Sequence, residues 1–219
     1  MKKLIFVPDL GTARVPERPL SPQRAERSAL LNPEDRRRFA AAEGITCGVL
    51  KRYFGLSDPQ ILGKAGERPR ILDSAVSFSR SYAGNALVIA VQSSGIIGVD
   101  CEPIRTPEEG VMKYFFTPAE RDFVRRCPDP GAGFSLIWTR KEAYVKCTGD
   151  GLHFPWHTLE TAPARLDLAD TPLCRENAPV GGLFLNSFLL DGMAVSVCSS
   201  ENDRFPPLIE WSSYETNDP

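Results

Sequence analysis

Carboxylates and a lysine on two separate stretches of the chain are the side chains best suited to chemistry. The first stretch, Ile-Ile-Gly-Val-Asp-Cys-Glu, ends at Glu102 and has the apolar, β-branched composition of a buried strand. Side chains on a strand alternate between its faces, so Asp100 and Glu102 are expected on the face opposite to Cys101. Two carboxylates converging at a strand end repel each other, and a hard divalent cation with oxygen ligands relieves that repulsion. The pair therefore indicates a metal site.

The second stretch has the pattern of a helix from about residue 133 to residue 147. On it Trp138, Glu142 and Lys146 follow one another at intervals of four and share one face. A third carboxylate with a lysine one turn away suits a site that holds a metal and a phosphate together. Each pattern alone is weak, because Asp-x-Glu occurs by chance and a helical Glu/Lys pair is usually a solvated ion pair.

Composition limits the classes of protein to which the chain can belong. Its 219 residues suffice for one large domain or two small ones. The formal net charge of −2 gives no general attraction to nucleic acid. No apolar run approaches the ~20 residues of a membrane span, and Pro8 interrupts the first strand too early for a signal peptide. We therefore expect a cytoplasmic protein that binds neither nucleic acid nor membranes.

The cysteines are scattered and form no Cys-x-x-Cys pair. In a chain without an export signal this favours reduced, mostly buried thiols over zinc ligands or disulfides. The six are Cys47, Cys101, Cys127, Cys147, Cys174 and Cys198.

Capping and turn residues mark the other elements. Asn32-Pro-Glu-Asp predicts the start of a helix that runs to about Phe54, where Gly55 ends it. Thr117-Pro-Ala-Glu predicts a second helix start with a capping box. Asp191-Gly192 predicts a hairpin between two strands. The remaining predictions are a first strand at the N-terminus, a short helix over 22–31, a loop over 55–75, and an antiparallel meander of strands 75–79, 86–91 and 96–102.

The two halves of the chain resemble each other. Each has a long helix before a hairpin, and Ala-Leu-Val-Ile-Ala-Val in the first half corresponds to Met-Ala-Val-Ser-Val in the second. The predicted fold class is α+β, with two similar lobes that each pack a long helix on a small antiparallel sheet. The lobes are residues 1–104 and residues 105–219, the latter ending in an acidic tail, and a ligand would bind in the cleft between them. An internal repeat of this kind predicts a monomer.

Taken together and in order, these motifs are specific. Gly98-Val-Asp-Cys-Glu, Phe115-Phe116, Trp138-x-x-Lys-Glu-Ala-Tyr-x-Lys and Gly149-x-Gly-Leu resemble the 4′-phosphopantetheinyl transferases of the larger, surfactin-synthetase-activating (Sfp) type. The resemblance implies a pseudo-dimer with a coenzyme A site between its lobes. It also implies Mg²⁺-dependent transfer of 4′-phosphopantetheine from coenzyme A to a serine of an apo acyl or peptidyl carrier protein, with release of 3′,5′-ADP.

The resemblance carries roles over to particular residues. Asp100, Glu102 and Glu142 match the magnesium ligands, and Lys146 matches the lysine that contacts the coenzyme A phosphate. Glu142, directly or through water, is the best candidate for the base that removes the serine proton, and Lys146 would stabilise charge on the leaving side. Phe115 or Phe116 belongs to the core, and the other is a candidate, with Met112, for an apolar contact to the carrier.

One position departs from the family pattern. Where the family has Ser-His-Ser, this chain has Ser79-Arg80-Ser81. An arginine can bind phosphate bidentately but cannot titrate near neutral pH, so binding could survive and a role for imidazole could not. The alternative is that Arg80 is a turn residue facing solvent.

Two further segments are candidates for the nucleotide part of the site. Gly66, Arg68 and Pro69 resemble the family's Gly-x-Lys-Pro segment, with arginine in place of lysine. Arg38 lies where the family places a cation for the 3′-phosphate, although the Arg36–Arg38 run is as easily a solvated helix face.

Two other functions remain open. The chain could be a non-catalytic module that binds coenzyme A or a carrier protein, and Arg80 is the feature that points to it. It could also be a Mg²⁺-dependent coenzyme A phosphohydrolase that needs no acceptor. The sequence does not identify the carrier protein or the biosynthetic pathway that it serves.

Overall fold

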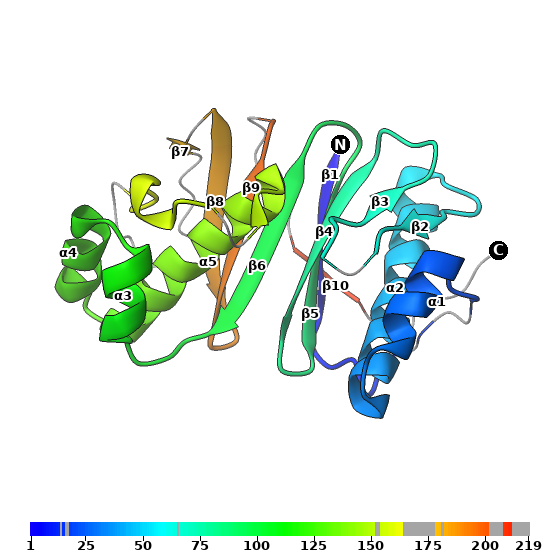
Figure 1. The fold of residues 1–219 in the computed structure, drawn as a ribbon, viewed down its shortest axis with the longest axis horizontal. Coiled ribbons are helices and arrows are strands. Elements are labelled where there is room, and N and C mark those ends of the chain that lie inside the picture. The colour runs from blue at the N-terminus through cyan, green and yellow to red at the C-terminus, as the bar shows by residue number, and fades with distance from the viewer. Residues whose placement is uncertain are drawn as a thin grey trace.

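Two four-stranded sheets form the centre of the molecule (Figure 1). The computed structural model describes residues 1–13, 15, 18–64, 66–151, 154–163, 178–180, 182–201 and 208–211. The first sheet has the strand order β10-β1-β5-β4, and the second has the order β6-β9-β8-β7. The first sheet consists of β1 (Lys2–Val7), β4 (Ser77–Ala83), β5 (Ala86–Gln92) and β10 (Ile209–Glu210). The second consists of β6 (Ile97–Pro103), β7 (Ala178–Val180), β8 (Leu183–Leu190) and β9 (Met193–Ser199).

The helices begin and end where their capping residues predict. The Asn32 side chain accepts hydrogen bonds from two backbone N–H groups of the first turn of α2, and Gly55 ends that helix with a φ of 68°. Thr117 and Glu120 form the predicted capping box at the start of α4. The helices are α1 (Pro22–Ala29), α2 (Pro33–Phe54), α3 (Glu109–Phe115), α4 (Pro118–Arg126) and α5 (Pro130–Thr148).

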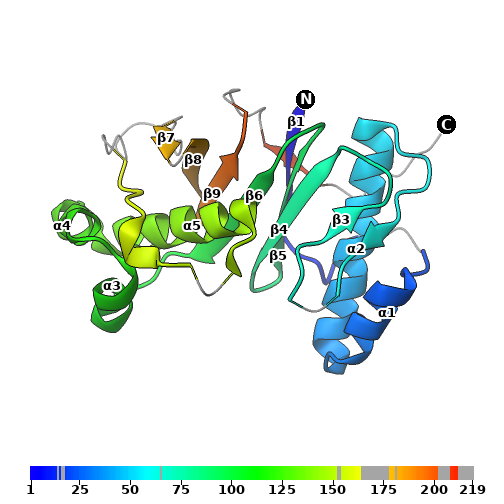
Figure 2. The same ribbon diagram turned by 45° about the horizontal axis from the view of Figure 1, so that its top comes forward.

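One long helix covers the outer face of each sheet (Figures 1 and 2). Alternate residues of β1 and β5, such as Ile5 and Ile89, pack against α2, and the residues between them, such as Val88, face the second sheet. On β6, Val99 and Cys101 point into this core between the sheets, and both are fully buried. Cys101 is therefore a core residue, as predicted. The other face of β6 packs against α5.

Two strands pair with strands from the other half of the chain. The strand β6 pairs with β9 of the second sheet, so the predicted meander of three strands in the first half is wrong. The short strand β10 returns to the first sheet and pairs in parallel with β1, and Trp211 is buried beside it. Both corrections have the same cause, because hydrogen-bond partners of a strand are chosen by tertiary packing and not by proximity in the sequence.

The other sequence predictions have mixed outcomes. The fold is mixed α+β, and the hairpin turn lies at Asp191-Gly192, both with positive φ. The predicted loop over 55–75 contains a small hairpin of β2 (Ile61–Leu62) and β3 (Arg70–Ile71). That the halves are copies of one unit remains a prediction. Leu152, Cys174 and the tail after residue 211 lie outside the described residues. In the described part of the chain, no helix combines the length and the apolar character that crossing a bilayer requires.

Candidate active site

The site lies where β6 packs against α5 and where β4, at the edge of the first sheet, meets β6 (Figure 1). The backbone N–H of Val99 donates to Ser79 Oγ at 3.0 Å across this seam. The seam therefore brings together Asp100 from β6, Lys146 from α5 and Ser81 from β4. Two of these three residues were predicted as site residues, from motifs far apart in the sequence.

Gly98 permits the close contact between β6 and α5. A Cβ at this position would lie 2.2 Å from the carbonyl oxygen of Ala143 and 2.4 Å from the backbone nitrogen of Cys147. Both are backbone atoms of the helix, so no side-chain rotation could relieve the clash. The strand carrying Asp100 can approach the helix carrying Lys146 only because residue 98 has no side chain.

We expect Gly98→Ala to push β6 away from α5. Overpacking of a core costs ~1–3 kcal/mol, so the free energy of unfolding should fall by about that amount in a denaturant titration. The separation should also lengthen the contact between Asp100 and Lys146. Gly110→Ala is the control, since a Cβ there meets nothing within 4 Å. Equal stability of the two variants would mean that the contact relaxes without cost.

Asp100 forms the polar centre of the site. Its side chain is buried, and Oδ1 accepts hydrogen bonds from Lys146 Nζ at 2.6 Å and from Ser81 Oγ at 2.7 Å. The second oxygen, Oδ2, is buried and has no hydrogen-bond partner in the described structure. A buried carboxylate oxygen without a partner is costly, so this atom is a candidate ligand for a bound group.

Glu102 and Glu142 are half-buried and respond to the same charges. Burial and the neighbouring Asp100 raise the pKa of Glu142, although Lys146 lowers it. Burial and Asp100 likewise raise the pKa of Glu102. Burial disfavours the charged form of Lys146, but Asp100 and then Glu142 outweigh it and raise its pKa. The three carboxylates thus repel one another, and one ammonium group only partly compensates them.

The donor set fits a hard divalent cation. Three carboxylates supply only oxygen, which Mg²⁺ prefers, and Asp100 Oδ2 is an open acceptor. In the described part of the chain, no three His, Cys, Asp or Glu side chains are close enough to hold a metal ion as they stand. Since Glu102 and Glu142 are only half-buried, a change of rotamer could bring their carboxylates toward Asp100.

Arg80 points away from Asp100, toward α2. Its Nη2 lies 2.6 Å from Glu43 Oε1 and its Nη1 donates to Thr46 Oγ1 at 3.3 Å, and the side chain is only 7% exposed. The same oxygen of Glu43 accepts from Arg24, which is also buried. Arg80 therefore does not face solvent. Its guanidinium contacts Glu43 and not the three carboxylates of the candidate metal site.

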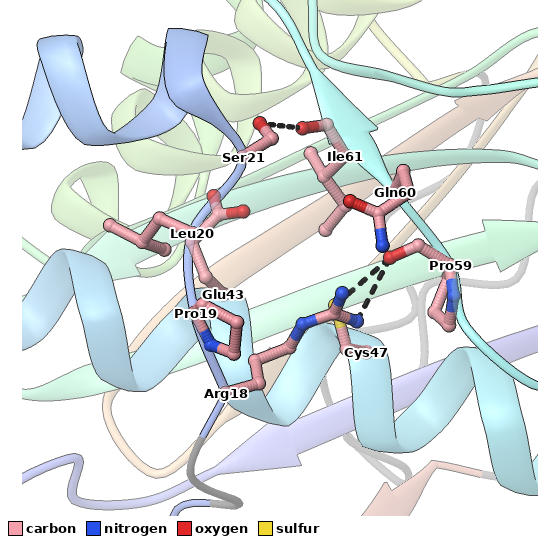
Figure 3. A pocket seen from close by; sticks show the side chains of 9 residues that line it. All are labelled: Arg18, Pro19, Leu20, Ser21, Glu43, Cys47, Pro59, Gln60 and Ile61. Atoms are coloured by element: carbon pink, nitrogen blue, oxygen red, sulfur yellow. Dashed lines mark hydrogen bonds between the residues drawn. The ribbon is translucent and has the colours of Figure 1, made fainter.

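A small pocket lies beside Glu43 on the α2 side of the first sheet (Figure 3). It encloses about 210 Å³, part of it open to solvent, and Arg18 crosses it to donate to the carbonyl oxygen of Pro59 at 2.9 Å. Burial raises the pKa of Cys47, which lines the pocket and remains a thiol. Asp100, Glu102 and Glu142 do not line this pocket.

The other predicted nucleotide residues have structural contacts of their own. Arg68 donates to the carbonyl oxygen of Cys147 at 2.7 Å and to that of Ile97 at 2.8 Å, so it ties the end of α5 to the start of β6. Gly66 has a φ of 81°, which only glycine adopts readily, and Pro69 packs beside Gly63 in the same loop. This loop therefore reaches the seam through Arg68.

Arg38 lies apart from this group. It pairs with Glu34 at 2.8 Å and with Asp35 at 3.8 Å on the surface of α2, and it donates to Asn85 Oδ1 at 2.9 Å. No contact joins it to Asp100 or Arg80 among the described residues.

The two phenylalanines of the motif differ. Phe116 is buried and stacks on Phe134, so it is the predicted core aromatic. Phe115 is half-buried and meets the rings of Trp138 and Trp156 edge-on. Met112 is 1% exposed, so the prediction that it shares an apolar contact surface is wrong, because it fills the core under α3.

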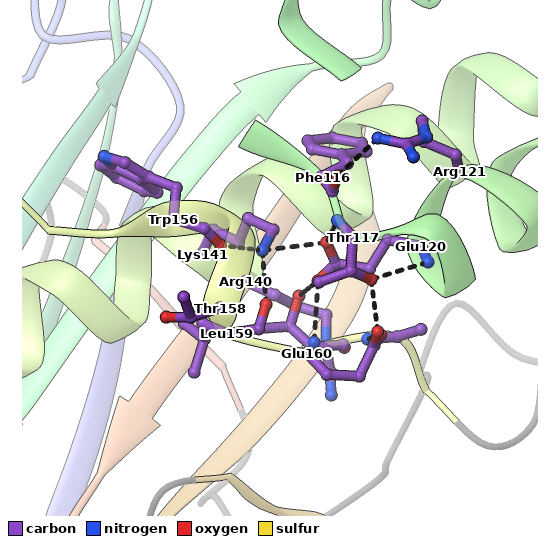
Figure 4. Close-up of polar contacts among 12 residues, drawn as sticks. Phe116, Thr117, Glu120, Arg121, Arg140, Lys141, Trp156, Thr158, Leu159 and Glu160 are labelled. Carbon is purple, nitrogen blue, oxygen red and sulfur yellow. Dashed lines mark hydrogen bonds and ion pairs between the residues drawn. The ribbon is translucent and has the colours of Figure 1, made fainter. Parts of the chain in front are cut away.

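A buried ion pair holds the second half of α5 in place (Figure 4). Lys141 Nζ lies 2.9 Å from Glu120 Oε2 and also donates to the carbonyl oxygens of Trp156 and Leu159. Glu120 in turn accepts from the backbone and hydroxyl of Thr161. Both charged side chains are fully buried, so this contact joins α4, α5 and the 156–161 segment beside Glu142.

Two residues were missed by sequence reasoning. Glu43 lies one turn after Phe39 on the inward face of α2, and an acidic residue on such a face could have signalled a buried ion pair with Arg80. Ser81 shares a strand face with Ser79, but nothing in the sequence indicates that this face meets Asp100.

Comparison with known proteins gives a consistent picture. Residues 96–185 match the model of the 4′-phosphopantetheinyl transferase superfamily. The chain is 37% identical over 130 residues to 4′-phosphopantetheinyl transferase HetI of Nostoc sp. (strain PCC 7120), which is 55% of this chain and 55% of that protein. It is 27% identical over 203 residues to 4′-phosphopantetheinyl transferase Sfp of Bacillus subtilis (strain 168), which is 90% of this chain and 88% of that protein. The chain thus spans about half the length of HetI and most of the length of Sfp.

Proposed function

We propose that this chain, a relative of the 4′-phosphopantetheinyl transferases, is an active transferase of the Sfp type. It transfers 4′-phosphopantetheine from coenzyme A to a serine of an apo acyl or peptidyl carrier protein and releases 3′,5′-ADP. The observation that carries the proposal is the buried, unpartnered Oδ2 of Asp100 beside Glu102 and Glu142. That arrangement disfavours the empty site and favours a site filled by a cation and the pyrophosphate that the cation neutralises.

Asp100, Glu102 and Glu142 would hold Mg²⁺. When bound, Mg²⁺ would neutralise charge on the pyrophosphate oxygens of coenzyme A. Lys146 lies against Asp100, so its ammonium group is held at the edge of the same site, and a third of its side chain is exposed. Its fixed positive charge would stabilise the charge that develops on the leaving phosphate.

The proposed transfer is a displacement at phosphorus. The carrier serine oxygen attacks the β-phosphorus of coenzyme A, and the bond from that phosphorus to the bridging oxygen breaks, so that 3′,5′-ADP leaves with the electron pair. Glu142 takes the proton of the serine hydroxyl. In the protein without metal, burial and Asp100 raise the pKa of Glu142.

One assay separates this proposal from its alternatives. The protein is incubated with coenzyme A, Mg²⁺ and an apo carrier protein, and the carrier is weighed by mass spectrometry. A mass gain of one phosphopantetheine group supports the transferase. Breakdown of coenzyme A without a mass gain would indicate a phosphohydrolase. Binding without any reaction would indicate a non-catalytic module.

We propose that Arg80 and its neighbours bind a phosphate of coenzyme A from the α2 side. Two buried guanidiniums, those of Arg24 and Arg80, share the single carboxylate of Glu43, so the cluster carries an excess of positive charge. Burial lowers the pKa of nearby Arg27, and the charges of Arg24 and Arg80 lower it further. A bound anion would relieve the excess of positive charge.

Arg80→Ala should weaken coenzyme A binding by ~1.5–3 kcal/mol, the range for a hydrogen bond to a charged group. Calorimetric titration with coenzyme A and dephospho-coenzyme A measures this, and loss of discrimination between them would identify the 3′-phosphate as the bound group. Arg125→Ala, which removes an exposed arginine of α4, is the control. Unchanged affinity for both ligands in Arg80→Ala would mean that Arg80 serves only to neutralise Glu43.

A further inference from the structure

The hydroxyl of Ser81 lies between the two charged partners of the site. It donates to Asp100 Oδ1 at 2.7 Å and accepts from Lys146 Nζ at 3.0 Å, while Lys146 contacts the same Oδ1 at 2.6 Å. Ser81 belongs to β4 of the first sheet. Asp100 belongs to β6 of the second sheet, and Lys146 belongs to α5, which packs on that sheet. The three atoms thus form a closed triangle across the seam.

This triangle determines how the Asp100 carboxylate is oriented. A serine hydroxyl has one proton to donate, and here that proton goes to Oδ1 because Nζ of Lys146 can only donate. Oδ1 therefore receives two hydrogen bonds, and Oδ2 receives none. Rotation of the carboxylate would break both bonds at once. Ser81 and Lys146 together hold Oδ2 as the open acceptor of a buried side chain.

We propose that Ser81 is a positioning residue that presents Asp100 Oδ2 to the bound cation. The inference rests on the proposed function, in which Asp100 is a metal ligand. Ser81 does not touch the metal or the substrate. Partners that orient a ligating carboxylate typically change metal affinity by ~10–100-fold when they are removed.

The neighbouring serines of β4 supply matched variants. Ser77 lies on the same face of the strand, and its buried Oγ has no hydrogen-bond partner in the described structure. Ser77→Ala therefore removes the same atom from the same strand without touching Asp100. Ser81→Thr keeps the hydroxyl and suits a strand, so it should retain the metal affinity that Ser81→Ala loses.

The measurement is a titration of the protein with Mn²⁺ at saturating coenzyme A and without a carrier. The electron paramagnetic resonance signal of free Mn²⁺ reports how much of the ion is bound. We expect Ser81→Ala to bind Mn²⁺ ~10–100-fold more weakly than the parent, and Ser81→Thr and Ser77→Ala to bind it nearly as well as the parent. Affinity for coenzyme A without metal should be similar in all four proteins. A merely structural role for Ser81 would lower both affinities together.

A second mutation separates orientation of Asp100 from other effects. In an Asp100→Asn background, Ser81→Ala should change Mn²⁺ affinity little, because the carboxylate that Ser81 orients is gone. An equal loss in both backgrounds would overturn the proposal.

The outcomes also separate this proposal from the proposed function. Mn²⁺ affinity of Ser81→Ala within about twofold of the parent would overturn the role of Ser81 and leave the transferase proposal standing, provided that the parent modifies a carrier. A parent that binds Mn²⁺ but modifies no carrier would overturn the transferase proposal alone. A parent that binds no Mn²⁺ would overturn both.

Discussion

Glu142→Gln is expected to lower kcat for phosphopantetheine transfer by on the order of 10²-fold or more while coenzyme A still binds. Glutamine keeps the size and a hydrogen-bonding oxygen, but it can neither take the serine proton nor contribute a negative charge to the metal site. The measurement is the initial rate of carrier modification, with coenzyme A affinity determined separately by calorimetry. Glu26→Gln, at an exposed position of α1, is the control for loss of a glutamate elsewhere.

The same variant should be more stable than the parent when no metal is present. Burial and Asp100 raise the pKa of Glu142 in the folded protein above its value in the unfolded chain, ~4.3. Between these two pKa values the folded protein holds more protons, so its stability falls as pH rises through that window. Glutamine has no proton to lose. Melting temperatures measured from about pH 5 to about pH 8 without metal should therefore decline less in Glu142→Gln than in the parent.

Added Mg²⁺ should reverse this order. It should raise the melting temperature of the parent, whose carboxylates it neutralises, more than that of Glu142→Gln. If kcat hardly changes in the variant and only metal or coenzyme A binding weakens, Glu142 is a ligand and the proton goes elsewhere.

Lys141→Ala is expected to lower the free energy of unfolding by ~3–5 kcal/mol, the cost of leaving one partner of a buried ion pair without the other. Burial lowers the pKa of Lys141 and raises that of Glu120, so each charge is maintained chiefly by its partner. The carbonyl oxygens of Trp156 and Leu159 would lose their donor as well. Urea titration followed by tryptophan fluorescence measures the loss.

A double variant separates the charge effect from the loss of packing. Lys141→Met fills most of the same volume, and Glu120→Gln removes the unpaired charge while it keeps the capping interaction with Thr117. The double variant should therefore be more stable than Lys141→Met alone. If Lys141→Met by itself is as stable as the parent, the ion pair contributes nothing and only the volume of the side chain matters.

Local features of this protein follow from its amino-acid sequence alone. Helix ends follow from caps such as Asn32 and Thr117, because a side-chain oxygen satisfies nearby backbone N–H groups wherever the helix packs. The faces of β6 follow from period two, which sets Asp100 opposite the buried Cys101. The spacing of the α5 motif likewise predicted that Lys146 lies on the site face of its helix. The roles predicted for the site residues remain predictions.

Which of these elements come into contact depends on the tertiary structure. Ser81 and Asp100 are 19 residues apart and belong to different sheets, and Arg80 and Glu43 are 37 residues apart. Their contacts depend on β4 lying against β6 and on α2 covering the first sheet, and neither follows from a local pattern. The pairing of β6 with β9 and of β10 with β1 has the same origin. Every strand offers the same backbone N–H and C=O groups to a neighbour, so these groups do not select the partner. The partner is selected by the burial of side chains across the whole fold.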